Sequence, residues 1–68
     1  MLVITNLEVV VKVDGKRKCY IVSDDIDVCK YYYNHYVKEY KDVSDKHVEI
    51  YIYDYNKNAK IEHYDNQD

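Results

Sequence analysis

The stretch HVEIYIYDY at residues 47–55 decides the fold. Within it, aliphatic residues alternate with tyrosines: Val48, Ile50 and Ile52 against Tyr51, Tyr53 and Tyr55. Because successive side chains of a β-strand point to opposite faces, this segment predicts a strand with one aliphatic face and one face of tyrosines, the tyrosine ladder. A single helix covers only one face of a small sheet, so the second apolar face is expected to meet water, a second copy or a partner.

In the segments around this strand, apolar residues recur at regular spacings. Alternating apolar residues predict strands, and spacing of three and four predicts a helix. The expected elements are a strand over 2–13, a second over 18–22, a helix over 24–41, the strand over 47–55 and a last strand over 59–64. Polar residues at 56–58 predict the last turn, and residues 65–68 are expected to form a disordered tail.

The first hairpin has two alternative registers. Asp14-Gly15 is typical of a type I′ turn, which needs positive φ at both central residues. A two-residue loop places Tyr20 and Val22 on the side of the strand's inward valines, whereas a three-residue loop places Cys19 and Ile21 there. The sequence leaves both registers open.

Ser23 is expected to cap the helix, with the aspartates that follow it near the positive end of the helix dipole. One helical face is apolar and should cover the sheet: Ile26, Cys29, Tyr33, Tyr36, Val37 and Tyr40. Val28, Tyr31 and His35 fall on the far side of the helix, and Tyr32 lies at the border. The helix therefore leaves a smaller apolar strip of its own exposed.

Together these elements predict a single α+β domain over residues 1–64: a two-layer ββαββ arrangement, with a four-stranded sheet and one helix packed on one face. The element order and the second hairpin, Tyr53-Asp54-Tyr55-Asn56-Lys57-Asn58, resemble the β-grasp group, especially the small immunoglobulin-binding domains of streptococcal surface proteins. That resemblance implies central, parallel first and last strands. The last strand is poor in apolar residues, so the strand order stays open.

Composition limits the classes of function. The chain has 68 residues and a formal charge of −3, and its longest basic run, Lys16-Arg17-Lys18, fits a solvated hairpin tip better than a nucleic-acid footprint. The N-terminal segment has neither a signal-peptide pattern nor a membrane-spanning length, which predicts a cytoplasmic protein. Cys19 and Cys29 are then expected to be free thiols, with a bridge between them as the alternative.

The sequence lacks the motifs of common catalytic sites. It has one glycine, no phosphate-binding glycine loop, no GxSxG, no HExxH and no CxxC. The cysteines and the histidines His35, His47 and His63 do not have zinc-site spacing. We therefore expect no enzyme activity, no cofactor and no metal site.

The tyrosine ladder has four interpretations. Its rings can form a cross-strand cluster with Tyr20 or Tyr64, bury themselves in an isologous dimer, contact another protein, or stack on single-stranded bases. The favoured interpretation is partner binding together with homodimer formation. The residues expected to take part are Tyr51, Tyr53, Tyr55, Glu49, Tyr31 and His35.

The stretch from Val9 to Tyr36, in which Tyr20-Ile21-Val22-Ser23 runs into an acidic helix start, resembles the layout of some Cas9-inhibiting anti-CRISPR proteins and of small phage inhibitors of uracil-DNA glycosylase. The resemblance implies a noncatalytic inhibitor of a host protein, encoded by a phage or virus. Residues with GC-rich codons are scarce, which is typical of an AT-rich genome. The alternative is a single-stranded nucleic-acid binder that stacks bases on the tyrosine ladder.

Overall fold

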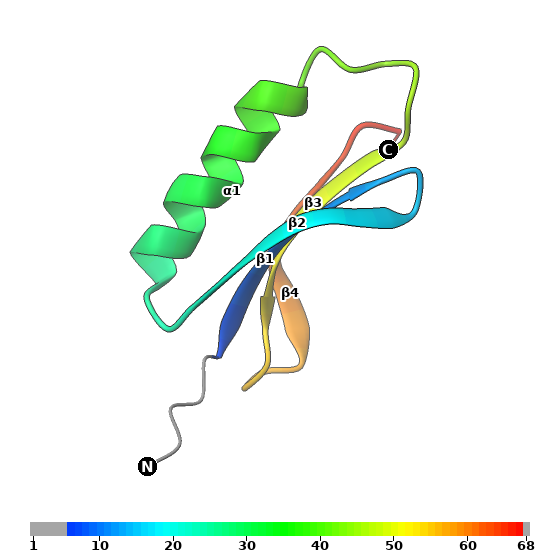
Figure 1. The fold of residues 1–68 in the computed structure, drawn as a ribbon. Helices are drawn as coiled ribbons and strands as arrows, with labels where there is room; N and C mark the ends of the chain where they lie inside the picture. The colour runs from blue at the N-terminus through cyan, green and yellow to red at the C-terminus, as the bar shows by residue number, and fades with distance from the viewer. Residues whose placement is uncertain (1–5, 68) are drawn as a thin grey trace.

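The computed structural model describes residues 6–67, apart from the side chains of Cys19 and Tyr20. It is a small α+β protein in which one helix packs on an antiparallel sheet, as the sequence predicts (Figure 1). The elements in chain order are β1 (Leu7–Val13), β2 (Lys16–Ser23), α1 (Ile26–Tyr40), β3 (Val48–Asp54) and β4 (Ala59–Asp65). The part of the first expected strand that precedes Asn6 lies outside the described residues.

The strand order in the described sheet is β2-β1-β3-β4, and each neighbouring pair is antiparallel. The strand order implied by the β-grasp resemblance is therefore wrong, since β1 pairs with β3 and β4 lies at an edge. The physical reason is burial. The apolar residues on both faces of β3 suit a central position, whereas most residues of β4 are exposed.

The first hairpin combines features of both expected registers. Its turn has two residues, Asp14 with φ 52° and Gly15 with φ 81°. Lys12 pairs with Arg17 but Val11 pairs with Cys19, so Lys18 is an extra residue that makes a β-bulge. The bulge brings Ile21 opposite Val9, which is the register expected of a three-residue loop.

The helix begins two residues later than expected because Asp25, and not Ser23, caps it. Its N-cap is Asp25, whose Oδ1 accepts a hydrogen bond from the backbone N–H of Asp27 at 2.9 Å. Ser23 instead accepts a bond from the backbone N–H of Asp25, and Asp24 accepts one from Asn6. Two of the residues expected at the helix start therefore fix the connection from β2 to α1.

The main core lies between α1 and the facing side of the sheet. Its fully buried or nearly buried residues are Leu7, Val9, Val11, Val13, Cys29, Val48, Ile50 and Ile52. The helical face predicted from the sequence packs on them, joined by Tyr32. Cys29 is a free thiol, and burial, together with the nearby charge of Asp25, raises its pKa. The side chain of Cys19 lies outside the described residues.

The C-terminal end differs from the expected tail. Strand β4 includes Asp65. The side chain of Asn66 forms hydrogen bonds with the segment that connects α1 to β3. Its side-chain N–H₂ donates to the carbonyl oxygens of Val43 at 3.0 Å and Lys46 at 2.8 Å, and its Oδ1 accepts from the N–H of Val48. Residues 65–67 are therefore part of the fold, and Asp68 lies outside the described residues.

Candidate interaction face

The side of the sheet away from α1 carries no helix within residues 6–67 (Figure 1). We call this side the open face. The strand registers place on it one row of side chains from each strand, together with Tyr55 just after β3: Glu8, Val10, Lys12, Arg17, Val22, Glu49, Tyr51, Tyr53, Tyr55, Lys60, His63 and Asp65. Four of the six residues predicted to bind a partner, Glu49 and the tyrosine ladder, thus share one surface.

Tyr51 at the centre of the open face is buried, with only 8% of its surface exposed. It lies opposite Val10, which is fully buried. The Nζ of Lys60 is 4.5 Å from the Tyr51 ring centroid and that of Lys12 is 5.9 Å away. The expectation that the whole ladder is open to solvent or a partner is therefore wrong at Tyr51, because long basic side chains from the neighbouring strands cover its ring.

The other two ladder tyrosines form a cluster around Glu8. Glu8 is only 7% exposed although it is on the open face. Its carboxylate accepts a hydrogen bond of 2.6 Å from the hydroxyl of Tyr55 and lies 3.6 Å from the guanidinium of Arg17. These partners offset the cost of burying a charge.

Tyr55 is 52% exposed, but its side chain is held at two points. Its hydroxyl is bonded to Glu8, and its ring packs edge-on against Tyr53, with centroids 4.7 Å apart. Tyr53 is in turn fixed by a bond of 3.2 Å from its hydroxyl to Asn58. Val22, 44% exposed, lies across β1 from Tyr53, with Glu8 between them. We name Val22, Tyr53 and Tyr55 the aromatic edge.

The hydrogen bond to Glu8 raises the pKa of Tyr55, because a phenolate would face the carboxylate. A raised folded-state pKa means that this bond stabilises the fold below the unfolded pKa of about 10 and that the stabilisation is lost as pH rises through the folded value.

We expect the NMR titration of ring-labelled Tyr55 to move to lower pH in Glu8→Gln, which removes the negative charge. An unchanged midpoint would show that the bond does not persist in solution.

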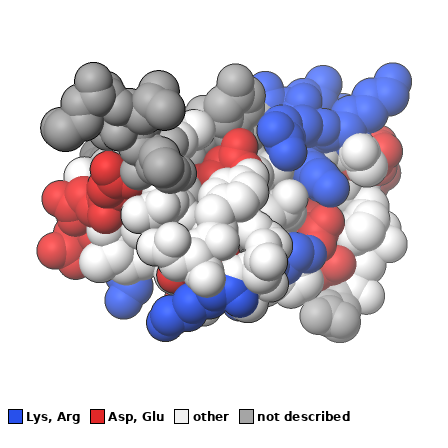
Figure 2. Space-filling view, turned by 90° about the horizontal axis from the view of Figure 1, so that it is seen from below, with Lys and Arg blue, Asp and Glu red and all other residues white. Residues whose placement is uncertain are grey.

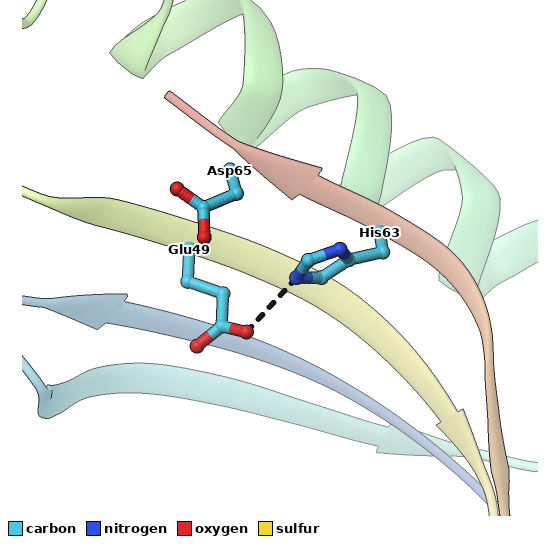
Figure 3. Close-up of side chains that lie close together, drawn as sticks. All are labelled: Glu49, His63 and Asp65. Atoms are coloured by element: carbon cyan, nitrogen blue, oxygen red, sulfur yellow. Dashed lines mark hydrogen bonds and ion pairs between the residues drawn. The ribbon is translucent and has the colours of Figure 1, made fainter. Parts of the chain in front are cut away.

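A second cluster occupies the other end of the open face. The Nε2 of His63 donates to Glu49 at 2.9 Å, and the Nζ of Lys60 donates to the same oxygen at 3.0 Å. The Nε2 of His47 lies 2.9 Å from Oδ1 of Asp65. Figure 3 shows Glu49, His63 and Asp65 together in front of the sheet, with α1 behind it.

Hydrogen bonds set the charges of this cluster. Those from His63 and Lys60 lower the pKa of Glu49. Hydrogen bonds from the backbone N–H of Gln67 and, to a smaller extent, from His47 lower the pKa of Asp65. The hydrogen bond to Asp65 in turn raises the pKa of His47. The cluster thus holds two ionised carboxylates beside imidazole and ammonium groups.

Sequence reasoning missed this cluster because it searched for ligands close together in one segment. The available signal was a pair of alternations: His47 with Glu49, and His63 with Asp65, each two residues apart and so on one face of a strand. Only the pairing of Glu49 with Asp65 brings the two alternations together. That pairing follows from the strand order, which the sequence left open.

The two remaining predicted residues lie elsewhere. Tyr31, 68% exposed, and His35 are on the outer surface of α1, on the opposite side of the molecule from the open face. Tyr31 packs edge-on against Tyr32, and the Nε2 of His35 lies 3.6 Å from Glu39. The structure therefore does not bring them together with the tyrosine ladder, and one flat partner surface cannot touch both groups.

Comparisons with known proteins found no matching family model, no matching curated protein and no matching solved structure. The likeness to anti-CRISPR proteins in layout therefore stays a prediction. Within residues 6–67, no helix has the length and apolar character needed to cross a membrane.

Proposed function

We propose that the protein is a noncatalytic protein-interaction module that binds its partner through the aromatic edge of the open face. We also propose that the whole chain has the element order ββαββ, with its four strands in one sheet. The observation that carries the binding proposal is the state of Tyr55: the ring is half exposed, yet it is held by Glu8 and Tyr53. The bond from Tyr55 to Glu8 serves the fold, and it also holds a half-exposed aromatic residue in one orientation in which a partner can contact it.

A ring that is already fixed favours binding for an entropic reason. Immobilising a side chain on association costs about 0.5–1.5 kcal/mol, and Tyr55 has lost most of that freedom before any partner arrives. Tyrosine is also enriched among the residues that dominate binding energy at protein interfaces. Tyr55 would act as the anchor, with Tyr53 and Val22 as its apolar surroundings.

The occupant we propose is a different protein rather than a second copy. A standard interface buries about 800 Å² per partner, roughly one sixth of the 4888 Å² of accessible surface here. On the open face only Val22 and Tyr55 are large, exposed and apolar among the described residues. Obligate homodimer interfaces are more hydrophobic than this, whereas interfaces between separately folded partners have a small apolar centre and a polar rim.

We further propose that the partner is a host protein and that this chain is an inhibitor encoded by a phage or virus. The composition supports this origin, because the chain is small, acidic, rich in tyrosine and poor in residues with GC-rich codons. The charged residues around the aromatic edge are already paired within the chain, as Arg17 is with Glu8 and Lys60 with Glu49. A partner would therefore meet charges of both signs there, which favours a partner surface of mixed polarity.

The test compares two variants in capture from a host lysate and then with the purified captured protein. Val22→Ser combined with Tyr55→Ser should weaken binding at least tenfold, since anchor residues contribute about 2 kcal/mol or more. The matched control is Tyr31→Ser, which removes an exposed tyrosine from the opposite side of the molecule. Binding that survives the double change, or that is lost in Tyr31→Ser, would refute the proposed face.

Sedimentation of the purified protein separates the two occupants. We expect a monomer at micromolar concentration for both the native chain and the double variant. A native dimer that the double variant dissociates would make a second copy the occupant and would contradict the proposal of a different protein. Circular dichroism of each variant checks that the fold is retained.

One observation favours a second candidate, single-stranded nucleic-acid binding: Lys12, Arg17 and Lys60 share the open face with the tyrosines, as in proteins that stack bases beside a basic groove. Two of these cations are paired with carboxylates, and acidic and basic groups are interspersed over the face drawn in Figure 2. Titration of a labelled oligonucleotide decides the matter. Salt-sensitive binding that requires Tyr55 would favour this candidate, and no binding at low salt would eliminate it.

A further inference from the structure

We infer that Glu49, His63 and Asp65 form a binding site for a divalent transition-metal ion of the Zn²⁺ type. One ligand atom from each of the three side chains lies within 4.8 Å of the others. Imidazole nitrogens and carboxylate oxygens are both ligands that zinc accepts in proteins. The inference goes beyond protein binding and does not depend on the aromatic edge.

The distances are close to those that a bound ion requires. Ligand bonds of 2.0–2.2 Å in a tetrahedral arrangement place the ligand atoms roughly 3.3–3.6 Å apart. The Nε2 of His63 and an oxygen of Glu49 are 2.9 Å apart, and the widest separation in the group is below 4.8 Å. Small side-chain rotations therefore suffice to surround an ion, with solvent completing the coordination.

The three side chains project from two paired strands. Glu49 is on central strand β3, and its cross-strand partner is Asp65 of β4. His63 stands two residues before Asp65, on the same face of β4 (Figure 3). Ligands on paired strands are held more precisely than ligands on loops, so little order has to be gained on binding.

Neighbouring groups support the carboxylate ligands. Asp65 accepts hydrogen bonds from Nε2 of His47 at 2.9 Å and from the backbone N–H of Gln67 at 3.0 Å. Such bonds orient a ligand, and their loss typically weakens metal binding 10–100-fold. We assign His47 as a positioning residue for Asp65.

The imidazole ligand selects the class of ion. Ca²⁺ and Mg²⁺ prefer sites made of oxygen ligands, whereas Zn²⁺ and neighbouring transition metals accept imidazole. In the free protein, the Nζ of Lys60 donates a hydrogen bond to the same Glu49 oxygen that accepts one from His63. An ion would displace this ammonium, which already lies 4.5 Å from the Tyr51 ring centroid. Lys60 is therefore expected to compete with the ion.

The experiment measures Zn²⁺ binding to the native chain by competition with a metal-sensitive dye and follows Co²⁺ by its visible absorption. We expect one ion per chain and a loss of affinity of at least tenfold in Glu49→Gln and in His63→Gln. The matched control is His35→Ala, which removes an exposed histidine beside Glu39 on the outer helix surface. It should bind the native amount of Zn²⁺ with unchanged affinity.

Two further comparisons test the assigned roles. His47→Ala should weaken binding, and His47→Gln, which keeps a side-chain donor for Asp65, should restore most of it. Lys60→Gln should bind Zn²⁺ more tightly because the competing cation is gone. Affinity unchanged in both Glu49→Gln and His63→Gln, or lost in His35→Ala, would overturn the site, as would no measurable binding to the folded native chain. The Val22 and Tyr55 double variant should keep full Zn²⁺ affinity, which separates this test from that of protein binding.

Discussion

Tyr51→Ser is expected to lower the free energy of unfolding by about 3–5 kcal/mol, the range measured for removing a buried aromatic ring. Tyr51 is almost completely buried on the open face, against Val10 and beneath Lys12 and Lys60. A chain of 68 residues has a total stability of only about 3–10 kcal/mol. The change should therefore remove from about a third to all of that stability, as measured by urea denaturation followed by circular dichroism at 25 °C.

The matched control is Tyr31→Ser, the same chemical change at a residue that is 68% exposed on the outer surface of α1. Surface substitutions of this kind usually stay within about 0.5 kcal/mol of the native chain. Similar losses in the two variants would mean that Tyr51 is not covered by its neighbours in solution. A small loss in Tyr51→Ser would have the same meaning and would return this ring to the set of partner contacts.

Ile50→Ala is the second change with a large expected effect, about 2–5 kcal/mol. Ile50 is fully buried at the centre of β3, where it packs with Val11, Val13 and Val48 beneath α1. Shortening this side chain leaves a cavity that strands on either side and a helix above cannot easily fill. Thermal and urea unfolding measure the loss.

Ile61→Ala provides the comparison, because Ile61 is partly buried at the bulge in edge strand β4. It removes the same atoms, and we expect less than half the loss seen for Ile50→Ala. Equal losses at the two positions would contradict the placement of β3 in the middle of the sheet and β4 at its edge. This pair therefore also tests the strand order.

The regular parts of the fold follow directly from periodicity in the sequence. Alternation in 47–55 predicts the aliphatic side of β3, and the spacing of Ile26, Cys29 and Tyr33 predicts the face of α1 that packs on it. Asp14-Gly15 predicts the first turn. These features depend on residues a few positions apart, so local patterns were sufficient.

The features that sequence reasoning missed depend on contacts between distant segments. The bulge at Lys18 changes the register of β2 without altering the turn. Lys12 and Lys60 cover Tyr51 only because β1 and β4 flank β3, and hydropathy counts lysine as polar although its long stem covers apolar surface. The cluster of Glu49, His63 and Asp65 likewise requires the pairing of β3 with β4. The sequence thus predicted that Tyr53, Tyr55 and Glu49 share one surface, but it did not predict that His63 and Asp65 lie beside Glu49.

The exposure of individual tyrosines in the free monomer is the most direct measure of the central claim, that the open face covers one ring and displays another. Photochemically induced nuclear polarisation with a flavin dye reports which tyrosine rings the dye can reach. We predict strong signals from Tyr55 and Tyr31 and none from Tyr51. A signal from Tyr51 as strong as that from Tyr55, or the absence of a Tyr55 signal, would contradict the account.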